Sequence, residues 1–188
     1  MLGFLRRRRH ERVGFELYGA AVAAARQPVF YRDLGVPDTL DGRFDLVGLH
    51  VFLVIRRLTG LPPPGPDVAQ AVFDAMFSDM DINLREIGVS DLVVGRRVKA
   101  MWEALHGRST AYEAAMAQEG AAGEAALAEA LARNVWRGEP PPTDGPAGDA
   151  PLRLARLVLH QATVLGALPD AELLAGRVRF AEPGAVPA

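Results

Sequence analysis

The sequence contains no cysteine. Disulfides, thiolate catalysis, zinc–cysteine sites and iron–sulfur ligation are therefore excluded. The four histidines, His10, His50, His106 and His160, have no i, i+4 spacing that would bring two of them together on one helix. A transition-metal site is consequently not expected.

Long hydrophobic runs are missing as well. The most apolar stretch, residues 46–55, has ten residues and contains His50, whereas a membrane-spanning helix needs roughly 20. A secretion signal is not expected, because Glu16 and Arg26 interrupt the apolar region that such a signal requires. We therefore expect a cytoplasmic protein.

Positive and negative charges are nearly balanced. The sequence has 21 Lys and Arg residues and 23 Asp and Glu residues, which gives a net charge of −2. This balance argues against a general DNA- or RNA-binding protein, which is usually clearly basic. The first twelve residues differ, because they contain five arginines and one acid. This arm, residues 1–12, is interpreted either as a solvated, partly disordered tail or as a segment on an anionic membrane surface, where each basic residue contributes about 1 kcal/mol. The candidate membrane-contact residues are Phe4, Leu5, Arg6, Arg7, Arg8 and Arg9.

No motif has a catalytic spacing. Residues 79–83 begin like an EF-hand loop, but Leu84 stands where glycine is needed and Ser90 where a bidentate glutamate is needed. Glu103 and His106 form a single Glu-x-x-His pair, whereas a carboxylate di-iron site needs two such pairs on facing helices. We therefore predict no catalytic, cofactor-binding or metal-binding residue.

Helical periodicity is what the sequence does contain. Apolar residues recur at steps of three and four, and strand-like alternation is no longer than residues 177–180. The fold is predicted to be all-α, a single-domain bundle of about six to eight helices. The expected helices cover residues 13–27, 44–58, 67–87, 90–105, 110–119, 127–135, 152–168 and 169–175. The helical domain is expected to span residues 13–180, with a proline-rich loop at 138–151 and a disordered tail at 181–188.

Two stretches stand out within this pattern. The helix at 44–58 is apolar on nearly all sides, which predicts a buried central helix with His50 hydrogen-bonded to a neighbouring helix. Residues 73–99 predict two amphipathic helices that are separated by Gly88, with Ser90 as the cap of the second. Their polar sides carry charges of both signs, which indicates a binding surface rather than a reactive centre.

Four stretches together resemble the ubiquinol–cytochrome c chaperone family, the bacterial relatives of the mitochondrial cytochrome b assembly chaperones. They are DLVGLHVFLVIRRL (Asp45–Leu58), FSDMDINLREIGVSDLVVGRRVK (Phe77–Lys99), HGRSTAYEAAM (His106–Met116) and ALARNVW (Ala130–Trp136). The resemblance covers about residues 40–137, with the helix after residue 152 included.

This resemblance implies an all-helical assembly factor for the cytochrome bc1 complex that binds newly made cytochrome b and has no enzymatic activity. The arginine-rich start is expected to hold the protein in a peripheral position at the cytoplasmic face of the inner membrane. Mitochondrial members work with a small partner protein and contact the ribosome, but no residue here indicates either interaction. The candidate client-binding residues are Arg56, Arg57, Asp79, Asp81, Asn83, Arg85, Glu86, Tyr112, Arg133 and Asn134.

Two alternatives stay open from the sequence. One is a small metal-dependent enzyme that uses Asp79, Asp81 and Glu86. The other is an RNA- or ribosome-binding adaptor, whose basic patch would form if the helices that carry its residues pack side by side. The residues of that patch are Arg56, Arg57, Arg96, Arg97 and Lys99.

Overall fold

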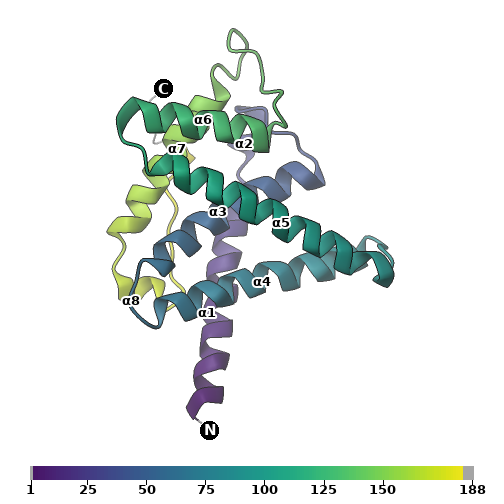
Figure 1. Ribbon diagram of the computed structural model, residues 1–188, viewed down its shortest axis with the longest axis vertical. Coiled ribbons are helices and arrows are strands. Elements are labelled where there is room, and N and C mark those ends of the chain that lie inside the picture. The colour runs from purple at the N-terminus through teal and green to yellow at the C-terminus, as the bar shows by residue number, and fades with distance from the viewer. Residues whose placement is uncertain (1, 184–188) are drawn as a thin grey trace.

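The computed structural model describes residues 2–183, with side chains from Arg7 onward, and this part of the chain forms eight α-helices (Figure 1). They are α1 (Leu2–Ala25), α2 (Pro28–Arg32), α3 (Leu40–Thr59), α4 (Gly65–Glu86), α5 (Asp91–Met116), α6 (Gly120–Val135), α7 (Ala150–Ala167) and α8 (Asp170–Leu173). No strand occurs between residues 2 and 183, so the all-α prediction is confirmed. None of the helices described is both long and apolar enough to cross a bilayer.

Helix α3 is the centre of the core, as predicted, because α1, α4, α5, α6 and α7 all contact it. Its side chains are buried along most of its length, and Leu46, Val51 and Val54 have no exposed surface. The helix begins at a capped end, where the Thr39 hydroxyl accepts a hydrogen bond from the Gly42 amide at 3.1 Å.

Helices α1 and α4 form the most extensive helix pair, and they cross at Gly14. A Cβ atom at Gly14 would lie 2.5 Å from the backbone carbonyl of Ala71, so only glycine permits this close approach. Helices α6 and α7 pack against each other on the other side of α3, and α5 runs from the end of α4 to α6 (Figure 1).

His50 is a buried core residue, as predicted, but its hydrogen-bond partner differs from the prediction. Its Nδ1 lies 2.8 Å from the Leu46 carbonyl of its own helix, and a carbonyl can only accept, so Nδ1 carries the proton. Phe30 and Phe180 both contact the ring in an edge-to-face arrangement, with centroids 5.5 and 5.2 Å away. Burial lowers the pKa of His50 to about 4, so the ring is neutral near pH 7.

Several helix boundaries differ from the sequence prediction. Helix α1 starts at Leu2 rather than Val13, because the basic segment continues a helix already nucleated in the core. Residues 28–32, expected to be irregular, form α2, in which Pro28 occupies the first turn and Phe30 is buried. The helix start predicted at Thr110 is wrong, since α5 continues through it and the Thr110 hydroxyl donates to the His106 carbonyl at 3.0 Å.

The C-terminal segment packs on α7 instead of leaving the bundle. Gln161 is buried, and its side chain donates to the Ala181 carbonyl at 2.9 Å and accepts from the Ala181 amide at 2.7 Å. Ala181, predicted to begin a disordered tail, is therefore held by two hydrogen bonds. The rest of that predicted tail, from residue 184, lies outside the described residues.

Candidate functional site

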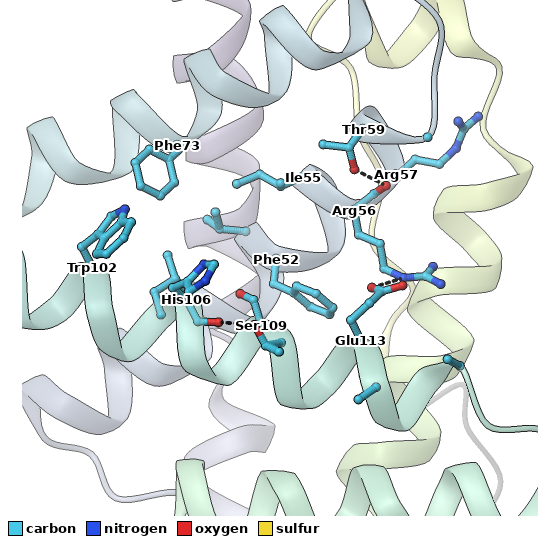
Figure 2. A pocket seen from close by; sticks show the side chains of 16 residues that line it. Phe52, Ile55, Arg56, Arg57, Thr59, Phe73, Trp102, His106, Ser109 and Glu113 are labelled. Atoms are coloured by element: carbon cyan, nitrogen blue, oxygen red, sulfur yellow. Dashed lines mark hydrogen bonds and ion pairs between the residues drawn. The ribbon is translucent and has the colours of Figure 1, made fainter.

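A groove of about 1000 Å³ lies between α3, α4 and α5 (Figure 2). Its apolar surface comes from Phe52 and Ile55 on α3, Phe73 on α4, and Trp102 and Leu105 on α5. The Trp102 side chain is 43% exposed, which is unusual for a tryptophan in a folded domain. The groove therefore presents accessible apolar surface in a concave site.

The groove begins where α5 crosses α3. A Cβ atom at Gly48 would lie 3.0 Å from Leu105 Cδ1, so glycine at this position allows the two helices to approach closely. On α3 the groove residues follow Gly48, from Val51 onward, and on α5 they run from Trp102, one turn before Leu105, to the end of the helix. The groove therefore lies on the side of this crossing that holds the second half of α3.

Trp102 and His106 form a stacked pair on successive turns of α5. Their ring centroids are 5.6 Å apart and their planes are nearly parallel, at 3°. Both rings line the groove, and Trp102 lies on the same side as Phe73 of α4 (Figure 2). The stack gives this wall a flat, rigid aromatic surface that can cover apolar groups.

A charged pair, Arg56 and Glu113, lies at the end of the groove opposite Trp102. Arg56 of α3 donates to Glu113 of α5 at 2.8 Å, which links the two helices across the groove (Figure 2). The neighbouring Arg57 points elsewhere, because it pairs with Asp170 at 2.6 Å and donates to two backbone carbonyls at the end of α7. Of the two predicted arginines, Arg56 therefore lies at the mouth of the groove, whereas Arg57 joins α3 to the α7–α8 turn.

A second cleft of about 630 Å³ lies on the other side of the α3–α5 crossing and is lined by α1, α3, α4 and α5. Two predicted residues, Asp79 and Asn83, belong to it. The Tyr18 hydroxyl of α1 donates to Asp79 at 2.6 Å, and the Asn83 amide donates to the Asp79 carbonyl at 2.7 Å. Burial, reinforced by Asp79, raises the pKa of Tyr18. Asp79 therefore fastens α4 to α1.

The remaining predicted residues of α4 stabilise the turn into α5. Arg85 donates to Asp81 at 2.6 Å and also pairs with Asp91 at the start of α5. Arg85 holds the pKa of the Asp81 carboxyl below its usual value, and Glu86 is exposed. Within residues 2–183, no three His, Asp or Glu side chains are grouped as a metal site would require. Asp79 and Asp81 therefore bind different partners, and together with Glu86 they do not form the acidic metal site that one alternative requires.

A buried ion cluster that the sequence analysis did not single out joins α3, α5 and the end of α6. Asp45 is buried in α3, where it pairs with Arg108 of α5 and lies 2.9 Å from Arg137. Burial raises the pKa of Asp45 to about 6, against the opposing effect of the two arginines. An acid at the start of an apolar helix was the available signal, but its partners lie more than 60 positions away in the chain.

The last three predicted residues, Tyr112 of α5 and Arg133 and Asn134 of α6, have different roles. Tyr112 is 2% exposed, packs its ring on Phe52 at 5.7 Å, and has its hydroxyl beside Asn134. Burial raises the pKa of Tyr112. Arg133 is exposed and pairs with Glu129 on its own helix. The Tyr112 ring therefore contributes to the contact between α5 and α3, while Arg133 faces solvent.

The predicted basic patch is not brought together. Arg56 pairs with Glu113, whereas Arg97 lines the second cleft, sixteen positions earlier on α5. At 1.5 Å per residue, the two sites are about 24 Å apart along the helix. Lys99 lies 3.7 Å from Glu103 on the same helix.

Comparison with known proteins decides the family. A family model described as ubiquinol-cytochrome C chaperone matches residues 32–180, most of the chain. The chain belongs to this family. The match covers residues 40–137 and the helix after residue 152, both of which the sequence resemblance included, and it extends to the C-terminal segment that packs on α7.

Two similar proteins support this family membership. Over 158 residues the chain is 28% identical to the mitochondrial protein CBP3 of Saccharomyces cerevisiae, covering 82% of this chain and 45% of that protein. The chain thus spans less than half the length of this curated relative. The crystal structure of the Cbp3 homolog from Brucella abortus is similar over 100% of both chains, with 34% sequence identity and a TM-score of 0.81.

Proposed function

We propose that this member of the ubiquinol-cytochrome C chaperone family promotes assembly of ubiquinol–cytochrome c reductase, the bc1 complex, by binding newly made cytochrome b. The observation that carries the proposal is the family match over residues 32–180. The role is non-catalytic: the protein holds its client temporarily and releases it when later subunits bind more tightly.

The groove between α3, α4 and α5 is the surface that best suits such a client. Cytochrome b is an integral membrane protein, so its segments are apolar helices before they are assembled. A helix recognised by a soluble partner commonly lies in an apolar groove between other helices. Ile55, Phe73 and Trp102 supply the accessible apolar contacts here, and the Arg56–Glu113 pair supplies polar groups at one end.

The candidate residues divide into two groups on this proposal. Arg56 and Arg133 are accessible and suit a direct contact with loops of the client. Tyr112, Asp79 and Arg57 act indirectly, because their side chains fasten the helices that form the groove and the neighbouring cleft.

The geometry does not favour the two alternatives. A metal-dependent enzyme would need Asp79 and Asp81 to converge, but they bond to Tyr18 and Arg85 respectively. An RNA-binding adaptor would need one continuous basic surface, but the basic residues of α3 and of the start of α5 lie on opposite sides of the helix crossing.

Deletion of the gene tests the proposal. We expect the amount of assembled bc1 complex to fall while transcripts of its subunits stay at their normal level. Newly made cytochrome b should copurify with the tagged protein from the complemented strain. Normal bc1 levels in the deletion strain would refute the proposed function.

A further inference from the structure

The second cleft, between α1, α3, α4 and α5, combines a buried apolar lining with accessible apolar groups. Its volume of about 630 Å³ lies within the range of small-molecule sites. Phe44 and Leu84 are almost completely buried, whereas Leu40 and Ile87 are 58% and 61% exposed. The fold therefore leaves apolar surface uncovered in a concave site that the proposed client groove does not include.

The lining of this cleft suits a hydrocarbon chain. Met80 of α4 and Met101 of α5 are half-buried there, and the flexible methionine side chain adapts to apolar groups of irregular shape. The neighbouring polar groups already have partners, since the Tyr18 hydroxyl and the Asn83 amide both donate to Asp79. An extended peptide segment would need partners for its backbone donors and acceptors, whereas a hydrocarbon chain needs none.

Three arginines around the cleft come from different parts of the fold: Arg26 directly after α1, Arg43 in α3 and Arg97 in α5. All three are exposed. Arg26 and Arg43 also share a smaller neighbouring pocket, so they lie close together. Arg43 pairs with Asp38 at 2.6 Å, but Arg26 and Arg97 form no ion pair within the part of the chain whose side chains are described.

The acidic residues of the cleft have other partners. Asp79 accepts the hydrogen bond from Tyr18, and Asp41 lies 3.7 Å from Arg137, which is not part of the cleft. The guanidinium groups of Arg26 and Arg97 are thus available to an anion, and a guanidinium binds a carboxylate through two parallel hydrogen bonds.

We infer that this cleft binds a single-chain anionic amphiphile of the fatty-acid class, with its hydrocarbon chain on the methionine-containing lining and its carboxylate on the arginines. The inference stands apart from the proposed function, because it needs no client and uses a different site. Charge complementarity decides the class of ligand, since a cationic amphiphile would meet the same apolar lining but would be repelled by the arginines.

Isothermal titration calorimetry of the purified full-length chain tests this inference with two probes of equal chain length. Dodecanoate, kept below its micelle-forming concentration, should bind with one-to-one stoichiometry, and dodecyltrimethylammonium should bind at least about 10-fold more weakly. Equal affinities would overturn the inference, as would a dodecanoate Kd above about 1 mM. Binding of an acidic amphipathic peptide without binding of dodecanoate would assign the cleft to a polypeptide partner and would also overturn it.

Two neighbouring arginines of α5 provide matched variants. Arg96 and Arg97 are both exposed, but only Arg97 lines the cleft. Arg97→Gln should weaken dodecanoate binding about 10-fold, whereas Arg96→Gln should leave it within about 2-fold of the parent. Glutamine has a helix propensity close to that of arginine, so both variants should fold normally. Equal losses would show that only overall charge matters and would overturn the inference.

A further pair of variants distinguishes the cleft from the client groove. Ala100 is exposed and lines the cleft, so Ala100→Trp should fill the site without disturbing the core and should weaken dodecanoate binding at least about 10-fold. Trp102→Glu alters the groove but not the cleft and should leave dodecanoate binding unchanged. The reverse result would place the amphiphile in the groove and overturn the inference.

Discussion

At the scale of single residues, two buried ionisable groups of α3 respond to pH in opposite ways. Burial raises the pKa of Asp45 to about 6 and lowers the pKa of His50 to about 4. Below about pH 6 folded Asp45 holds a proton that the unfolded chain releases near pH 4, so its contribution to stability is lost as pH rises from about 4 to 6. Folded His50 excludes a proton that the unfolded chain binds below about pH 6.5, so its contribution is lost as pH falls from about 6.5 to 4.

Replacing Asp45 with Asn separates these two effects. The variant lacks the titrating carboxyl, so its free energy of unfolding relative to the parent should rise as pH increases from about 4 to 6 and then stay level. Urea unfolding at a series of pH values measures this difference, and His50 cancels because both proteins contain it. The opposite slope would mean that Arg108 and Arg137 outweigh burial and hold the pKa of Asp45 below its usual value.

At the scale of helices, two glycines determine how closely the long helices cross. Gly14 allows α1 to approach α4, and Gly48 allows α5 to approach α3. Helix α1 also contains Gly19, at which an added Cβ atom would meet nothing within 4 Å. The same helix therefore offers one glycine required by packing and one that is not.

Replacing each of these glycines with alanine gives matched variants. Gly14→Ala places a methyl group against the Ala71 backbone and should destabilise the fold by about 1–3 kcal/mol or more. Gly19→Ala should be neutral or stabilising by up to about 1 kcal/mol, because alanine favours the helix over glycine. Thermal and urea unfolding measure both changes. Equal effects of the two substitutions would show that helix propensity, not the crossing, determines the requirement at Gly14.

Helix positions were largely readable from the sequence because apolar periodicity reports local structure. The buried helix α3 and the hairpin of α4 and α5 follow from such patterns alone. The errors arose where tertiary contacts override local signals. Thr110 and Glu113 look like a helix start, but Glu113 pairs with Arg56 of α3, so its carboxylate contributes to a contact between helices.

The groove was less predictable than the helices. Its shape depends on the crossing of Gly48 with Leu105, which joins residues 57 positions apart. Trp102 belongs to the apolar stripe of α5, but the periodicity of this helix alone does not reveal that the side chain stays 43% exposed. The buried cluster around Asp45 was missed for the same reason, since Arg108 and Arg137 come from distant helices and only folding brings them together.

At the scale of the whole molecule, the groove and the basic arm are separate surfaces. The groove is formed by α3, α4 and α5, whereas the arm is the start of α1, a helix that contributes no residue to the groove. Substitutions at distant sites without shared partners usually act independently. Substitutions in the arm should therefore leave client binding in the groove unchanged.

Trp102→Glu places a charge on the apolar wall of the groove and should reduce copurification of cytochrome b at least about 10-fold, because buried tryptophans often dominate an interface. Leu92→Glu on the same helix is the control: Leu92 is 90% exposed and lies outside the groove, so this variant should behave like the parent. If Trp102→Glu and Leu92→Glu reduce client recovery equally, the client does not bind in this groove.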